Sequence, residues 1–234
     1  MAYSEMICLA YSRKEGGCCV VGIEKETGKW LRPATGIKGM PLLPDACTLP
    51  DGTQPAVLDL IGLDLGAPCP NSHQVENVQA LRSPWKLISR PAPASLMPLI
   101  LSGLKRGSGI FGDKAVYLTH AAAIAKAAQG SATFINPRGI RFFWQTKFRT
   151  QLRASFYHHD DHYSLPVTDL AVERRLEHLE KGKWIHFRET GIDPGLGVFF
   201  TVTLGEPFHP TGFAEPLCYK LVSGVAIFPK NWRQ

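Results

Sequence analysis

The sequence MICLAYSRKEGGCCVVGIEKETGKWLRP, residues 6–33, carries the strongest signal for the fold of this chain. Two apolar runs, 6–11 and 18–23, flank a polar turn that contains glycines, and a Thr-Gly turn precedes a third short run at 30–33. Short apolar runs joined by tight turns are typical of an antiparallel meander, the usual beginning of a small β-barrel. We therefore expect three successive strands in this stretch.

Strand-like patterns recur on both sides of a central region with a different composition. Residues 56–65 and 75–81 are expected to complete a first barrel, whereas 91–130 contains apolar spacing that fits helices. The β pattern returns from residue 132 and is interrupted by one amphipathic helix at 168–181. Strands, one helix and further strands follow in the order of a Greek-key barrel such as the OB-fold. We predict a mainly β protein with α-helices and two OB-like barrels, the N-terminal barrel at 1–90, a helical connector at 91–130 and the C-terminal barrel at 131–234.

Composition argues against several classes of protein. The chain is 44% hydrophobic with 22 Gly and 18 Pro, which argues against disorder and favours many short strands. No apolar run approaches the roughly 20 residues of a membrane span, and the N-terminus lacks the pattern of a signal peptide. The six cysteines contain no Cys-x-x-Cys pair, so neither a zinc site nor a disulfide framework is expected. We expect a cytoplasmic protein with no membrane partner, no cofactor and no metal.

Stretches spread along the whole chain resemble one family of bacterial proteins. They are ICLAYSRK (7–14), GKWLRP (28–33), RASF (153–156), YSLPVTD (163–169), LGEPF (204–208) and CYKLV (218–222). The order and spacing of these stretches resemble those of the dual-OB-domain family. The resemblance implies two OB-like barrels, nucleic-acid or nucleotide binding by analogy with other OB-folds, and an accessory role in bacterial antiviral defence. It supplies no catalytic residues, and OB-folds also serve unrelated functions.

The main candidate for a functional surface is the segment 138–157, which contains five cations and no acid. Alternate side chains of a strand point to opposite faces, so Phe142, Trp144 and Phe148 are expected to face the core. The other face would combine cations with aromatic rings, and this combination binds single-stranded nucleic acid through its phosphates and stacked bases. The alternative is a solvated strand face, and a one-residue bulge would exchange the two faces. The candidate residues are Arg138, Arg141, Phe143, Lys147, Arg149, Arg153 and Tyr157.

Two further segments are basic. Arg13, Lys14 and Arg32 are expected to lie near the glycine turn, where backbone amides could approach a phosphate; the alternative is a plain hairpin turn. The segment KRGSG, residues 105–109, lacks the spacing of a nucleotide-binding loop, and a flexible joint is expected there; the alternative is a mobile phosphate contact.

The sequence HHDDH, residues 158–162, contains the ligand types of a metal site. Consecutive strand residues point in opposite directions, however, so a solvated turn is the favoured interpretation. No Gly-x-Ser-x-Gly motif and no catalytic cysteine context is present, so we do not expect an enzyme. A hydrolase or nuclease that uses these histidines is the least favoured hypothesis.

The sequence as a whole predicts a nucleic-acid-binding module for single-stranded or distorted DNA or RNA, held by phosphate contacts and aromatic stacking. A net charge of +6 is compatible with such a partner. The alternative is a sensor of a nucleotide or small ligand, or an adaptor that binds a protein partner in a defence system.

Overall fold

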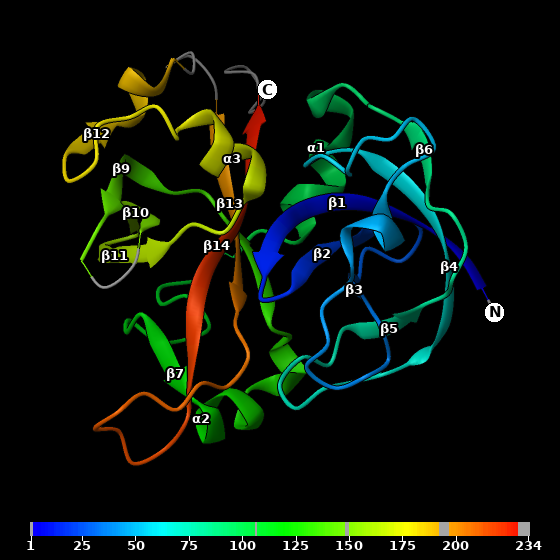
Figure 1. The fold of residues 1–234 in the computed structure, drawn as a ribbon, viewed down its shortest axis with the longest axis horizontal. Coiled ribbons are helices and arrows are strands. Elements are labelled where there is room, and N and C mark those ends of the chain that lie inside the picture. Colours follow the sequence, from blue (N-terminus) through cyan, green and yellow to red (C-terminus); the bar gives the residue numbers. More distant parts are fainter. Residues whose placement is uncertain (1, 106, 148–149, 192–196, 229–234) are drawn as a thin grey trace.

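The computed structural model describes residues 2–105, 107–147, 150–191 and 197–228, which form two lobes (Figure 1). The strands of the N-terminal lobe follow the order β1-β2-β3-β5-β4-β6 in one sheet, and a further pairing of β1 with β4 closes a five-stranded barrel. These strands are β1 (Ala2–Lys14), β2 (Gly17–Glu24), β3 (Trp30–Ala34), β4 (Leu60–Pro68), β5 (Asn77–Ala80) and β6 (Lys86–Ser89), with a 3-10 turn at Pro44–Cys47.

The meander expected at the N-terminus is present, and its first strand is longer than the apolar pattern indicates. β1 continues to Lys14, which pairs with Gly17, so the hairpin turn consists of Glu15 and Gly16. Gly16 has a φ of 76°, a left-handed conformation that glycine adopts at no steric cost. The glycine therefore permits the tight connection between β1 and β2.

The region expected as a helical connector, residues 91–130, contains two α-helices and one short strand. The hydroxyl of Thr119 accepts a hydrogen bond from the N–H of Ala122 at 3.2 Å, so Thr119 is the N-cap of the second helix. Ile110 is buried in the core of the C-terminal lobe, which ties the loop between the helices to that lobe. The elements of this region are α1 (Pro93–Ser102), β7 (Tyr117–Thr119), α2 (His120–Ala125) and a 3-10 turn at Ala127–Gln129.

The C-terminal lobe contains two four-stranded sheets in the orders β11-β10-β9-β12 and β7-β14-β13-β8. Both sheets contribute to one apolar core and form a half-barrel, so the chain has the predicted fold class. Within the described ranges, no helix combines the length and apolarity that a membrane crossing requires. The elements are β8 (Ala132–Ile135), β9 (Arg138–Gln145), β10 (Gln151–His158), β11 (Asp161–Pro166), α3 (Leu170–Arg175), β12 (Trp184–His186), a 3-10 turn at Phe187–Thr190, β13 (Gly197–Leu204) and β14 (Leu217–Phe228).

Helix α3 spans Leu170–Arg175 and is therefore shorter than the helix expected at 168–181. The buried carboxylate of Asp169 caps its N-terminus. Asp169 Oδ1 accepts hydrogen bonds from the N–H groups of Ala171 at 2.9 Å and Val172 at 3.1 Å. Its Oδ2 accepts a third from the N–H of Val225 on β14 at 2.8 Å. Burial raises the pKa of this carboxyl to about 6. Asp169 thus joins the helix to the neighbouring strand.

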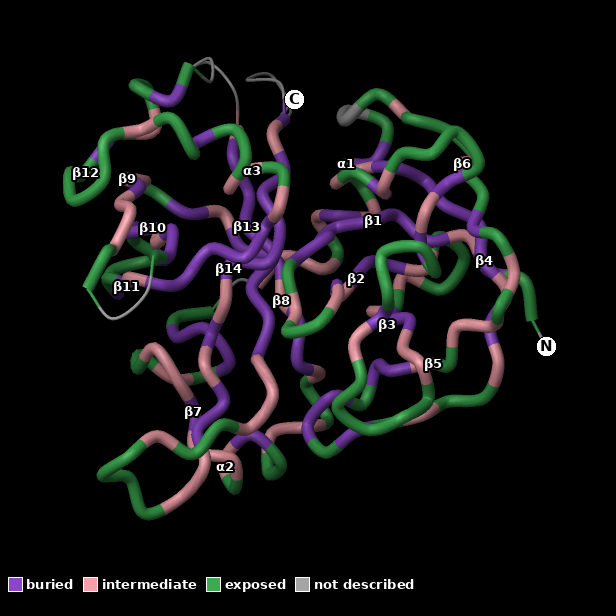
Figure 2. The backbone as a smooth tube through the Cα atoms, in the orientation of Figure 1, coloured by how far each residue is buried: buried purple, intermediate pink, exposed green. Residues whose placement is uncertain are grey.

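The two lobes share an apolar cluster and are in direct backbone contact. Figure 2 shows the buried parts of β1, β13 and β14 meeting at the centre of the molecule. The Thr201 hydroxyl donates to the carbonyl oxygen of Leu9 at 2.7 Å. A Cβ atom at Gly224 would collide with the same carbonyl oxygen, so only glycine allows β14 to approach β1 so closely. The relative position of the lobes is therefore set by packing.

Candidate functional site

The alternation expected for β9 and β10 is present in the structure. Phe142 and Phe156 are buried in the core, and Trp144 is half-buried with its indole N–H donating to the carbonyl oxygen of Leu176 at 2.7 Å. A register shift is present between β9 and β10, but it lies between the pairs of Ser155 and Tyr157, beyond the segment 141–145. The faces of that segment are therefore not exchanged.

The outward face of this sheet, which we call the β9 face, carries a stacked aromatic pair. Phe143 on β9 pairs in register with Trp184 on β12, and their rings stack with centroids 4.8 Å apart and planes at 28°. The guanidinium carbon of Arg141 lies 5.9 Å from the centre of the Trp184 ring, within the range of a cation–π contact. Trp184 remains 43% exposed. The pair is thus a preformed aromatic platform with a cation beside it.

A second aromatic group lies on the same face. Tyr157 on β10 is 44% exposed, and its ring centre is 5.1 Å from that of His162 on β11. The Nε2 atom of His162 lies 2.8 Å from the hydroxyl of Ser155. Gly139 lies against the Tyr157 ring and borders a cavity of about 750 Å³ that His186 and other residues also line. A hollow therefore adjoins this part of the β9 face.

The remaining candidate cations differ in their surroundings. Arg153 lies opposite Phe143 in the β9–β10 register, and its Nη2 donates to the carbonyl oxygen of Ser164 at 2.5 Å. Arg138 is exposed and donates to the carbonyl oxygen of His159 at 2.8 Å. Lys147 is exposed at the end of this segment. Arg149 and the expected core residue Phe148 lie outside the described residues.

The second basic group does not form a cationic surface. Arg32, which was expected near the glycine turn as a phosphate-binding cation, is only 6% exposed and forms an ion pair with Glu76, so its charge is compensated in the interior. Arg13 and Lys14 stay near the surface, and each forms an ion pair with a carboxylate. The partners are Glu173 for Arg13 at 2.8 Å and Glu206 for Lys14 at 3.0 Å.

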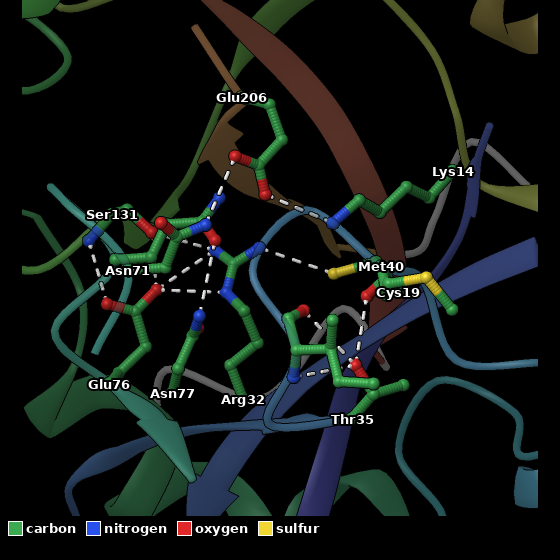
Figure 3. A network of polar contacts seen from close by, with 12 residues as sticks. Lys14, Cys19, Arg32, Thr35, Met40, Asn71, Glu76, Asn77, Ser131 and Glu206 are labelled. Atoms are coloured by element: carbon green, nitrogen blue, oxygen red, sulfur yellow. Dashed lines mark hydrogen bonds and ion pairs between the residues drawn. The ribbon is translucent and has the colours of Figure 1, made fainter. Parts of the chain in front are cut away.

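Arg32 belongs to a buried polar network between the lobes (Figure 3). Its Nε and Nη2 atoms donate to Oε1 of Glu76 at 3.1 and 2.9 Å, and Nη2 also donates to the hydroxyl of Ser131 at 2.8 Å. Burial opposes ionisation of Glu76, but the Arg32 charge and the hydrogen bonds from Ser131 outweigh it and lower the pKa of the carboxyl. The network therefore holds two opposite charges in the interior.

A family model described as the dual OB-containing domain matches residues 4–225. The chain belongs to the dual OB family. This finding confirms the resemblance that the sequence motifs indicate. No match is found among curated proteins or solved structures. Membership in the dual OB family suggests a binding module.

The histidine-rich segment of this dual OB protein does not converge on one point. His158 is buried with Nε2 at 3.1 Å from the carbonyl oxygen of Gly107, and burial lowers the pKa of its imidazole. Asp161 forms an ion pair with Lys114 at 2.8 Å, and His162 lies on the β9 face. Across the part of the chain that the structure describes, no group of three His, Cys, Asp or Glu side chains could hold a metal ion.

Sequence reasoning did not identify Trp184, which lies about 40 positions from Phe143 in the chain yet stacks on it in this dual OB protein. The available signal was weak. GKWIH at 182–186 repeats part of GKWLR at 28–32, and Trp30 in the first copy packs against an apolar cluster. The repeat therefore marked two tryptophans without distinguishing a core ring from a surface ring.

Proposed function

We propose that this chain binds single-stranded nucleic acid on the β9 face. The observation that carries the proposal is the Phe143–Trp184 stack, in which Trp184 is exposed and Phe143 half-buried, with the Arg141 guanidinium beside it. Bases stack on exposed aromatic rings whatever their sequence, and each stacked base contributes about 1–3 kcal/mol. Tyr157 offers a second ring on the same face. Recognition by these groups has little base specificity, because it depends on the π-faces and the phosphates.

The charges around the β9 face support a polyanionic ligand. Arg141 and Arg153 lie on adjacent strands of the face. One neighbouring acid, Asp161, is neutralised by its ion pair with Lys114. Cations near exposed rings can therefore follow the phosphates of a strand while the bases stack.

Family membership supports the same class of function without naming a ligand. OB-folds frequently bind oligonucleotides through one sheet face and its loops. An accessory role in bacterial defence, with a protein partner in such a system, rests on the family resemblance alone. Co-purification of a stable protein partner, with no affinity for oligonucleotides, would favour the adaptor function instead.

The test is a titration of fluorescently labelled single-stranded DNA and RNA with the purified chain, followed by anisotropy at several salt concentrations. Affinity should fall as salt rises, because phosphate contacts release counterions. Trp184→Ala should weaken binding about tenfold or more, since it removes a stacking surface. Arg141→Gln should weaken binding and reduce the salt dependence.

The control is Arg82→Gln, which removes the same charge from an exposed position on the N-terminal lobe. It should leave affinity nearly unchanged. Binding that ignores salt, or unaltered affinity in folded Trp184→Ala and Arg141→Gln proteins, would contradict the proposed face.

A further inference from the structure

A cavity of about 300 Å³ opens at the N-terminal barrel where the second lobe meets it. Its walls come from the ends of β1, β2 and β3, the loop of residues 36–42, the segment between residues 69 and 77, and Glu206 of the second lobe. This volume is at the lower end of the range of about 300–1,000 Å³ for small-molecule sites. The cavity is therefore large enough for one small ligand.

One wall of the cavity consists of hydrogen-bonding groups that hold one another in place. The carboxylate of Glu206 accepts hydrogen bonds from Lys14 Nζ at 3.0 Å and from Asn71 Nδ2 at 3.3 Å (Figure 3). Arg32 lies in the same wall, and its Nη1 donates to Cys19 Sγ at 3.2 Å. A carboxylate has about four acceptor positions, so Glu206 can accept a further hydrogen bond from a ligand.

The opposite wall is an apolar loop with a defined shape. The hydroxyl oxygen of Thr35 accepts the N–H of Ile37 at 3.2 Å, and the hydroxyl lies 3.4 Å from the carbonyl oxygen of Met40. Ile37 and Met40 are 63% and 50% exposed, and Pro41 and Leu42 continue the wall. Exposed apolar side chains gathered beside a cavity are typical of binding surfaces.

Within the described chain, Asn77 contributes a buried amide with an unsatisfied acceptor to the cavity wall. The side chain is buried at the cavity wall, and its Nδ2 donates to Gln74 Oε1 at 3.4 Å. Among the described residues, its Oδ1 has no hydrogen-bond partner. Buried side-chain oxygens nearly always have one. The oxygen has almost no surface open to the cavity, so a ligand N–H group would reach it only after the Asn77 side chain rotates.

We propose that this cavity binds a nucleoside monophosphate. A nucleobase has apolar faces and an edge with both donors and acceptors, which match the loop wall and the polar wall respectively. Lys14 and Lys38 border the cavity, but Lys14 is paired with Glu206, and the charge of Arg32 is offset by Glu76. Among the described residues of the lining, Lys38 therefore gives the rim one excess positive charge, which suits a phosphate. The site is separate from the β9 face and does not depend on the function proposed for it.

The experiment is isothermal titration of the full chain with the four ribonucleoside and the four deoxyribonucleoside monophosphates. At least one of them should bind with a stoichiometry near one. Ala34→Phe places a ring in the cavity and should abolish this binding. Lys38→Ala should weaken it about tenfold, the effect of losing one charged hydrogen bond.

Lys29→Ala is the matched control for Lys38→Ala, because Lys29 is an exposed lysine outside the cavity lining. It should leave the affinity within about twofold. Circular dichroism confirms the fold of each variant, and Lys38→Ala keeps the test valid if Ala34→Phe does not fold. The proposal is overturned if none of the mononucleotides and no 5′-phosphorylated strand binds to the cavity, or if folded variants bind as the unmodified chain does.

The nucleotide can be free or form the end of a strand, and a second titration distinguishes the two. The double variant Trp184→Ala and Arg141→Gln lacks the exposed ring and the neighbouring charge of the β9 face. It is titrated with a short oligonucleotide that either carries or lacks a 5′-phosphate. Binding that requires the 5′-phosphate and is lost in Ala34→Phe identifies a strand end. Binding of mononucleotides alone identifies a free nucleotide, and in that case the β9 face can fail its own test while the cavity passes.

Discussion

Arg32 and Glu76 form a buried ion pair in which Nη2 of the arginine lies 2.9 Å from Oε1 of the glutamate. Ser131 of the second lobe joins the pair, because its hydroxyl accepts from Arg32 and its backbone N–H donates to Glu76 Oε2 at 3.2 Å. The pair therefore links the lobes as well as balancing two interior charges. Loss of either partner leaves the other charge buried and uncompensated.

Glu76→Gln should lower the free energy of unfolding by about 3–5 kcal/mol, the usual cost of breaking a buried pair. Urea denaturation of the variant and the unmodified chain measures the difference. The matched control is Glu5→Gln, which breaks the exposed pair of Glu5 with Lys25 and should cost at most about 1 kcal/mol. Equal small losses in both variants would show that the Arg32–Glu76 pair is not an interior one.

The stability should depend on pH through Asp169. Burial raises the pKa of its carboxyl to about 6, whereas an aspartate in an unfolded chain has a pKa of about 3.9. Between these values the folded state binds more protons than the unfolded state, so this contribution to stability is complete below about pH 4 and falls as the pH rises through about 6. Measuring unfolding of the unmodified chain and of Asp169→Asn across this window isolates the effect.

Asp169→Asn is also expected to be less stable at every pH in the window, because an amide cannot accept hydrogen bonds from both α3 and Val225. The stability advantage of the unmodified chain should shrink as the pH rises. A difference that stays constant across the window would mean that Asp169 does not titrate there.

Lys220 should hold the loop before β7 in place. Its ammonium group is buried and donates to the carbonyl oxygens of Asp113 at 2.8 Å and Ala115 at 2.5 Å, and burial lowers its pKa to about 8. Lys220→Met removes both hydrogen bonds and should speed tryptic cleavage after Lys114. Limited proteolysis at neutral pH followed by mass spectrometry measures the rate, and Lys181→Met, at an exposed position, is the control. Equal cleavage rates would contradict this role.

Trp184 should report nucleic-acid binding through its fluorescence. An oligonucleotide stacked on the exposed ring quenches its emission, whereas Trp85 is buried in the first barrel and should not respond. Trp184→Phe should lose the quenching but keep much of the affinity, because phenylalanine still offers a stacking surface. Quenching that persists in Trp184→Phe would place the contact at another tryptophan.

Local patterns predicted part of this candidate site and missed another part. The alternation of Phe142 and Phe143 follows from strand geometry alone, so their opposite faces could be predicted. The register shift between β9 and β10 leaves the faces of residues 141–145 unchanged. Trp184 could not be assigned to the face, because the pairing of β12 with β9 depends on long-range packing.

Alternation, turn chemistry and burial act over a few neighbouring residues, so the amino-acid pattern was enough to predict the β-rich class, the first hairpin, and the side of β9 that faces the core. Which charges are neutralised and which rings meet depends on the folded arrangement of the chain. Glu76 reaches Arg32, Glu206 reaches Lys14, and Trp184 stacks on Phe143 across long stretches of chain. Such contacts form when sheets pack and lobes join, and no local pattern contains the positions of both partners.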